Sequence, residues 1–195
     1  MLSNRNKCDR KVRKTMSEYK KLKQDLIYKG RIIELYKDTV QLPNGKQVEW
    51  DFVKHKGASA IVAVDQDGKL LMVRQYRNAI DRMSLEIPAG GIDIGEKPEE
   101  AALRELQEET GYCAQNITHL IDVETAVGFT NETIYVYLAT GLIEKEQNLD
   151  EDEFVTIERY EVEELLDQII KGEIKDAKTI AAVFTYRELY GKGKK

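Results

Sequence analysis

The apolar positions of this chain change period along its length, and the period indicates which element each stretch forms. Residues 26–55 are rich in β-branched and aromatic residues around an Asn44-Gly45 pair, the strongest short signal for a β-hairpin. Short apolar runs over 58–65, 69–76, 83–87, 117–125, 133–139 and 154–159 predict further strands. Helical patterns cover 98–110, 163–171 and 177–190. Strands mixed with helices in this order predict an α/β protein.

The helix over 98–110 has clear start and stop signals. Pro98 suits the first helical turn, where its missing N–H costs nothing. Glu99 and Glu100 follow it and complement the positive end of the helix dipole. Gly111 is suited to the left-handed conformation that ends many helices. The sequence therefore predicts both ends of this helix.

Two faces of the predicted helix differ in character. The face of Ala102, Leu103 and Leu106 is apolar and expected to be buried. The carboxylates of another face fall within an arc of about 100°, beside the small Ala101. They are Glu105, Glu108 and Glu109. Like charges at this spacing cost about 0.2–0.5 kcal/mol per pair, and Mg²⁺, which prefers oxygen ligands, would reverse that cost. The spacing alone leaves two interpretations open, a metal site and a solvated acidic face.

A longer pattern surrounds the helix. Gly90 is followed after five residues by Glu96, and after seven more by the run RELQEETGY at 104–112. This stretch resembles the complete Nudix box, with every fixed position filled at the right interval. The resemblance implies an α/β/α sandwich with a mixed sheet. It also implies a Mg²⁺-dependent hydrolase, with Mn²⁺ as the alternative ion, acting on a nucleoside diphosphate linked to another group.

The resemblance also assigns roles within the box. The metal ligands would be the carbonyl of Ala89 and the carboxylates of Glu105, Glu108 and Glu109, with Glu108 serving a second cation. Arg104, counted with Glu108 among the catalytic residues, would orient the glutamates by salt bridges. Gly90 is expected at the substrate, and we expect Gly90 and Gly91 to adopt backbone angles that a Cβ atom would forbid.

An acidic run, DEDE at 150–153, precedes the last predicted strand. Composition alone suggests ordinary surface acids. Nudix hydrolases that cleave ADP-ribose carry a Glu-x-Glu in this loop, and Glu151 and Glu153 match its spacing. The resemblance then makes Glu151 the general base and Glu153 a metal ligand, although the spacing does not decide which of the two is the base.

Over residues 26–190 the chain resembles the ADP-ribose pyrophosphatase branch of the family. The runs that carry this resemblance are LPNG at 42–45, VRQYR at 73–77, EIPAG at 86–90 and DAKT at 176–179. By this resemblance Arg77 would contact the substrate phosphate and Glu86 would line the ribose side. Trp50 would stack on adenine, unless it is an ordinary strand aromatic. Gly128 and Phe129 match a substrate loop.

One departure affects the choice of substrate. Val127 stands where this branch usually has a proline before the Gly-Phe pair. The expected reaction is hydrolysis of ADP-ribose to AMP and ribose 5-phosphate. The alternative is another sugar nucleotide such as GDP-mannose, and a less favoured one is a non-catalytic module that senses ADP-ribose.

Composition limits the partners and the domain organisation. The 195 residues are 42% hydrophobic and 33% charged, and the net charge of −5 argues against broad nucleic-acid binding. No apolar run reaches the length of a membrane span, no secretory signal is present, and the two cysteines form no metal-spaced cluster, so we expect a cytoplasmic protein. We predict a basic extension over 1–25, a β-hairpin subdomain over 26–56 and a Nudix domain over 57–195. The apolar hairpin is too thin to bury itself, and we expect it to form a homodimer.

Overall fold

The computed structural model describes residues 18–149 and 154–191. The predicted loop residues Glu151 and Glu153 lie outside this range. The chain forms two compact units. The first contains the described residues up to His55 together with Ala126–Asn131, and the second contains Lys56–Thr125 and the described residues from Glu132 onward.

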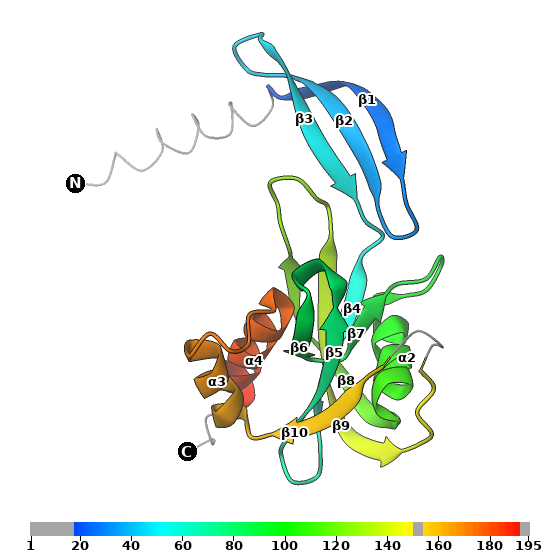
Figure 1. The fold of residues 1–195 in the computed structure, drawn as a ribbon, viewed down its shortest axis with the longest axis vertical. Helices are drawn as coiled ribbons and strands as arrows, with labels where there is room; N and C mark the ends of the chain where they lie inside the picture. Colours follow the sequence, from blue (N-terminus) through cyan, green and yellow to red (C-terminus); the bar gives the residue numbers. More distant parts are fainter. Residues whose placement is uncertain (1–17, 150–153, 192–195) are drawn as a thin grey trace, which may run out of the picture. The chain divides into compact units, whose positions relative to one another are not determined.

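The first unit is an antiparallel sheet of β1 (Lys20–Lys29), β2 (Glu34–Gln41) and β3 (Gln47–Lys54) (Figure 1). The predicted hairpin is present as β2 and β3, and Gly45 in its turn has a φ of 83°. Strand β1 was not predicted, and it takes residues 20–25 out of the expected basic extension. Nearly every position of β1 is exposed, so no burial pattern marks it. Its backbone pairing with β2 makes it a strand.

The second unit contains a mixed sheet with β10, β5, β4, β9 and β8 in that spatial order. Two short strands also belong to this sheet: β6 pairs with β5, and β7 pairs with β4. The bounds are β4 (Ala58–Val64), β5 (Leu70–Arg77), β6 (Arg82–Glu86), β7 (Ala89–Gly91), β8 (Tyr112–Glu124), β9 (Thr133–Glu144) and β10 (Thr156–Tyr160). Strand β4 runs parallel to β9 and antiparallel to β5 and β7, which confirms the mixed sheet.

Helices cover both faces of this sheet (Figure 1). They are α2 (Pro98–Thr110), α3 (Val162–Ile170) and α4 (Ala177–Tyr190), and a short 3-10 helix, η1 (Asn78–Ile80), follows β5. On one face Leu106 of α2 packs with Ile61 and Leu71, and on the other Leu165 and Val183 of α3 and α4 pack with the sheet. Burying one such side chain fully contributes about 1.5–3 kcal/mol. The predicted α/β/α sandwich is confirmed.

Two features of the sheet were not visible in the apolar pattern. Strand β7 has only three residues, Ala-Gly-Gly, and exists because it pairs with β4. Strand β8 begins at Tyr112, five residues before its predicted start, because Tyr112 pairs with Glu144 at the far end of β9. Among the described residues, no helix is both long and apolar enough to cross a membrane.

Candidate active site

Helix α2 presents the acidic side chains of the site. The N–H of Lys97 donates to the carboxylate of Glu100 (3.2 Å), which closes the first turn beside Pro98. Gly111 takes the left-handed conformation with a φ of 71°, and its N–H donates to the carbonyl of Gln107 (2.8 Å). Both predicted helix ends are therefore confirmed.

The acidic face of α2 is not a solvated surface. Glu109 is only 2% exposed and Glu105 only 9%. Burying a charged carboxylate is costly unless it has partners. The two glutamates point into the second unit because α2 packs closely against β4 and β7. This burial contradicts the interpretation of the helix as a surface acidic face.

Arg104 connects the box residues as the resemblance suggested. Its Nη1 donates to Glu105 (2.6 Å) and to Glu108 (2.8 Å). Its Nε donates to Glu96 (2.9 Å), and its Nη2 donates to the carbonyl of Gly91 (2.9 Å). The hydrogen bond from Arg104 lowers the pKa of Glu96, and the same contacts raise the pKa of Arg104. Arg104 thus supplies positive charge between two of the candidate metal ligands.

Glu109 is held by hydrogen bonds from the sheet. It accepts a hydrogen bond from the N–H of Ala89 (2.9 Å) and one from Nε2 of Gln75 (3.2 Å). Gln75 lies on β5 within the run VRQYR, and no pattern in the sequence assigned it a role. These two hydrogen bonds fix the carboxylate of Glu109 against β5 and β7.

Gly90 does not have the backbone conformation that was predicted for it. It has no left-handed backbone conformation, and neither has Gly91. A Cβ atom on Gly90 would instead lie 2.0 Å from Oε1 of Glu105. The carboxylate of Glu105 therefore occupies the space that a side chain would take, directly against the backbone of β7.

The ligand types around α2 suit a hard divalent cation. Two buried carboxylates, the nearby Glu108 and the carbonyl of Ala89 are the oxygen ligands that such ions take. Within residues 18–149 and 154–191, no three acidic, histidine or cysteine side chains form a ready ligand group. Arg104 is bonded to Glu105 and Glu108 in this arrangement, and it supplies the neutralising charge.

A second group of charges lies around Glu86 on β6. Arg77 donates to both oxygens of Glu86, from Nε (3.0 Å) and from Nη2 (2.7 Å). Lys178 of α4 donates to Glu86 (2.5 Å) and to Asp176 (2.9 Å), and Thr179 also donates to Asp176. Glu86 is 3% and Lys178 7% exposed. The run DAKT at 176–179 was singled out in the sequence, but only the structure shows that it contacts Glu86.

Low pH should reduce the stability that the charged group around Glu86 contributes to the fold. Burial alone would raise the pKa of Glu86, but the Arg77 hydrogen bonds and the Lys178 charge outweigh it and lower the pKa from 4.5 to about 2. The stability that Glu86 contributes is therefore fully present above pH 4.5 and is lost as the pH falls to about 2. Urea unfolding at a series of pH values should show this loss in the wild type and a shallower one in Glu86→Gln. The exposed Glu99→Gln is the control, and equal slopes for all three proteins would contradict the expectation.

Three predicted substrate residues belong to the first unit. Trp50 on β3 is 50% exposed, and its ring lies 6.3 Å from that of Tyr19. The carbonyl of Phe129 accepts a hydrogen bond from the N–H of Val53 (2.7 Å), so the segment with Gly128 and Phe129 lies along β3. The second unit contains Arg77, Glu86, Ala89, Gly90 and the box residues.

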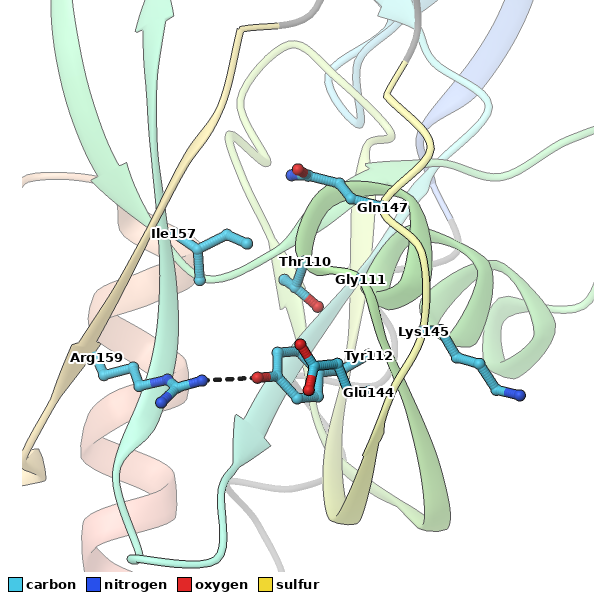
Figure 2. Close-up of a pocket in the computed structure, with 8 residues that line it drawn as sticks. All are labelled: Thr110, Gly111, Tyr112, Glu144, Lys145, Gln147, Ile157 and Arg159. Atoms are coloured by element: carbon cyan, nitrogen blue, oxygen red, sulfur yellow. Dashed lines mark hydrogen bonds between the residues drawn. The ribbon is translucent and has the colours of Figure 1, made fainter.

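A separate hollow of about 560 Å³ lies at the C-terminal end of α2 (Figure 2). Its lining consists of Thr110, Gly111, Tyr112, Glu144, Lys145, Gln147, Ile157 and Arg159. Arg159 points toward Tyr112 and donates to its hydroxyl (2.6 Å), whereas Lys145 points away. The lining carries both signs of charge and indicates no particular ligand, so the acidic face of α2 is the better candidate site.

Comparison with known proteins identifies the class. The model of the NUDIX domain matches residues 53–183, and the chain belongs to the Nudix family. It is a Nudix pyrophosphohydrolase, as the box predicted. Nudix hydrolases generally use divalent metal ions.

Individual relatives cover most of the chain. An ADP-ribose pyrophosphatase of Bacillus subtilis (strain 168) is 44% identical over 168 residues, which cover 85% of this chain and 91% of the relative. A methanol dehydrogenase activator of Bacillus methanolicus is 43% identical with the same coverage. A crystal structure of an ADP compounds hydrolase has a TM-score of 0.80 and 25% identity, and it covers 90% of this chain and 96% of its own.

Proposed function

We propose that this protein hydrolyses the pyrophosphate bond of ADP-ribose with Mg²⁺, giving AMP and ribose 5-phosphate. The observation that carries the proposal is the buried pair Glu105 and Glu109 beside the Ala89–Gly91 strand. The B. subtilis relative, named an ADP-ribose pyrophosphatase, supports the choice of substrate.

The box residues would hold the cation through Glu105, Glu108, Glu109 and the carbonyl of Ala89. A bound divalent cation neutralises phosphate charge, polarises phosphorus and lowers the pKa of the attacking water. Arg104 keeps Glu105 and Glu108 oriented and limits their mutual repulsion. Glu109 is held in place for the ion by hydrogen bonds from Gln75 and from the backbone of Ala89.

Arg77 is suited to a phosphate of the substrate. Its side chain is 40% exposed, while Glu86 fixes it through two parallel hydrogen bonds. A guanidinium has five N–H donors, so this fork leaves donors for a phosphate. Lys178 shares the charge of Glu86, which leaves more of the Arg77 charge for the substrate. Glu86 thereby acts on the substrate through Arg77.

The acids of the 150–153 run complete the proposed mechanism, with Glu151 as the base that takes the proton from water and Glu153 as a further ligand. Glu151→Gln should lower kcat with little change in Mg²⁺ affinity, and Glu153→Gln should raise the Mg²⁺ concentration needed for half-maximal rate. Mg²⁺ titrations of the steady-state rate separate the two effects. The roles are reversed if the two variants exchange behaviour, and neither residue takes part if both are silent.

A substrate panel tests the proposed reaction against its alternatives. The protein is incubated with Mg²⁺ and ADP-ribose, GDP-mannose, coenzyme A or diadenosine polyphosphates, and the phosphate products are analysed. We expect AMP and ribose 5-phosphate at the highest kcat/KM. Preference for GDP-mannose would support the alternative substrate that Val127, in place of the usual proline, suggests. Binding of ADP-ribose without cleavage would indicate a sensing module.

We further propose a homodimer formed through the β1–β3 sheet. Leu26, Ile27 and Tyr28 on β1 are each more than half exposed, and a thin sheet with exposed apolar side chains needs a hydrophobic partner. Light scattering should give the mass of a dimer, and deletion of residues 1–55 should give a poorly soluble monomer that does not bind nucleotide. A fully active monomer of the full chain would exclude this proposal.

Trp50 is proposed as the residue that stacks on adenine. Stacking stabilises the bound substrate and the transition state equally, so Trp50→Ala should raise KM more than it lowers kcat. Base–aromatic stacking is worth about 1–3 kcal/mol, which corresponds to a rise in KM of roughly 5- to 150-fold. Steady-state kinetics with ADP-ribose measure the effect, and an unchanged KM would remove Trp50 from the site.

A further inference from the structure

Ser59 on β4 has a buried hydroxyl group without a hydrogen-bond partner. The residue is fully buried, and its Oγ is the one side-chain polar atom of the described residues found buried and unpaired. Leaving a buried hydroxyl unpaired costs free energy, and alanine would fill the position without that cost. An exception of this kind in a well-packed core needs an explanation, and unpaired polar groups often have functional roles.

The strand pairing shows which way Ser59 faces. Side chains alternate along β4, and Ile61 and Ala63, two and four residues on, pack with Ala102 and Leu106 of α2. Ser59 therefore faces α2 as well. It is also the direct partner of Gly90 in the antiparallel pair of β4 and β7.

This register brings Ser59 close to Glu105. Directly opposed residues of an antiparallel pair have Cβ positions about 4.5–5.5 Å apart on the same face. The carboxylate of Glu105 fills the Cβ position of Gly90, with its three carboxylate atoms 2.0, 2.1 and 2.4 Å from it. Ser59 and the Glu105 carboxylate are thus neighbours inside the same layer between β4 and α2.

We infer that Ser59 is a positioning residue for the metal site, whose hydroxyl donates a hydrogen bond to Glu105 when that carboxylate binds a cation. Glu105 accepts a hydrogen bond from Arg104, and a second donor on β4 would help to fix the same carboxylate while it binds the cation. A serine hydroxyl can hold the carboxylate without adding positive charge that would compete with the ion. The inference rests on the proposed metal-dependent function and adds Ser59 to it.

The test compares metal affinity with stability. Mg²⁺ is titrated into the metal-free full-length protein by calorimetry, and urea unfolding is measured without metal. Loss of a group that orients a metal ligand typically weakens affinity 10- to 100-fold, and we expect about tenfold for Ser59→Ala. The urea midpoint of metal-free Ser59→Ala should stay the same or rise, because the variant removes an unpaired hydroxyl. A purely structural role of Ser59 would lower the midpoint and leave Mg²⁺ affinity unchanged.

Two further variants complete the design. Ser59→Cys keeps the side-chain volume with a weaker donor, so it should lose part of the affinity, and it keeps the test decisive if Ser59→Ala does not fold. Thr185→Val in α4 removes a hydroxyl that donates to the carbonyl of Ala181 (2.8 Å), and it should leave Mg²⁺ affinity unchanged. Unchanged Mg²⁺ affinity in both Ser59 variants would overturn the inference about Ser59 but would leave the proposed function standing. A wild-type protein that binds no Mg²⁺ overturns the proposed function and the inference together.

Discussion

Replacing Glu109 by glutamine is expected to lower kcat by about 100-fold or more while the fold is kept. Glu109 is 2% exposed and its two observed donors, the Ala89 N–H and the Gln75 amide, are neutral. The amide of glutamine has nearly the same shape, so the packing of α2 is preserved. It removes the charge that would hold the cation, and metal-ion catalysis supplies several kcal/mol of transition-state stabilisation.

The measurement is kcat for ADP-ribose over a Mg²⁺ titration that reaches saturation, with circular dichroism to verify folding. Glu99→Gln is the matched control, because it removes an exposed carboxylate from the first turn of the same helix. It should retain the wild-type rate. Wild-type turnover in Glu109→Gln at saturating Mg²⁺ would remove Glu109 from the metal site.

Gly90→Ala should be nearly as damaging although it adds a single methyl group. The new Cβ atom would lie 2.0 Å from Oε1 of Glu105 and 2.1 Å from its carboxyl carbon. Atoms cannot approach so closely, so the carboxylate of Glu105 must leave its position against β7. Misplacing a group at the reaction centre by about 1 Å can cost about 100-fold in rate, and we expect a loss of that size in kcat/KM.

Gly91→Ala is the matched control, one residue further along the same strand. Its added methyl would meet Cε of Lys56 at 2.9 Å, the far end of a flexible side chain that can move aside. Kinetics and Mg²⁺ calorimetry on both variants should show a large loss for Gly90→Ala and a small one for Gly91→Ala. Similar values for the two variants would show that Glu105 does not need its present position.

The sequence alone was sufficient to predict where α2 begins and ends. Pro98, Gly111 and the apolar positions Ala102 and Leu106 defined the helix, because caps and periodicity act over a few residues. The Nudix box within and before it named the family that the comparisons confirm. The turn at Asn44-Gly45 was equally predictable, because a tight turn depends on local backbone conformation.

The sequence did not predict features that depend on pairing with another segment of the chain. The strands β1 and β7 have no periodic pattern, and each exists because another strand offers it a ladder of hydrogen bonds. The reason for Gly90 was also misjudged, because the atom that occupies its side-chain space belongs to Glu105, fifteen residues away.

By itself, the sequence determined the mixture of strands and helices and the helix that carries the carboxylates, because both follow from local patterns. The resemblance of its box to the Nudix family implied the class of protein and the layered fold. Only the tertiary structure decided which charges meet. It buried Glu105 and Glu109, gave Glu109 its neutral donors, joined Lys178 to Glu86 across 92 residues and left the hydroxyl of Ser59 unpaired. Burial and charge pairing depend on which segments pack together, and no short stretch of sequence contains that information.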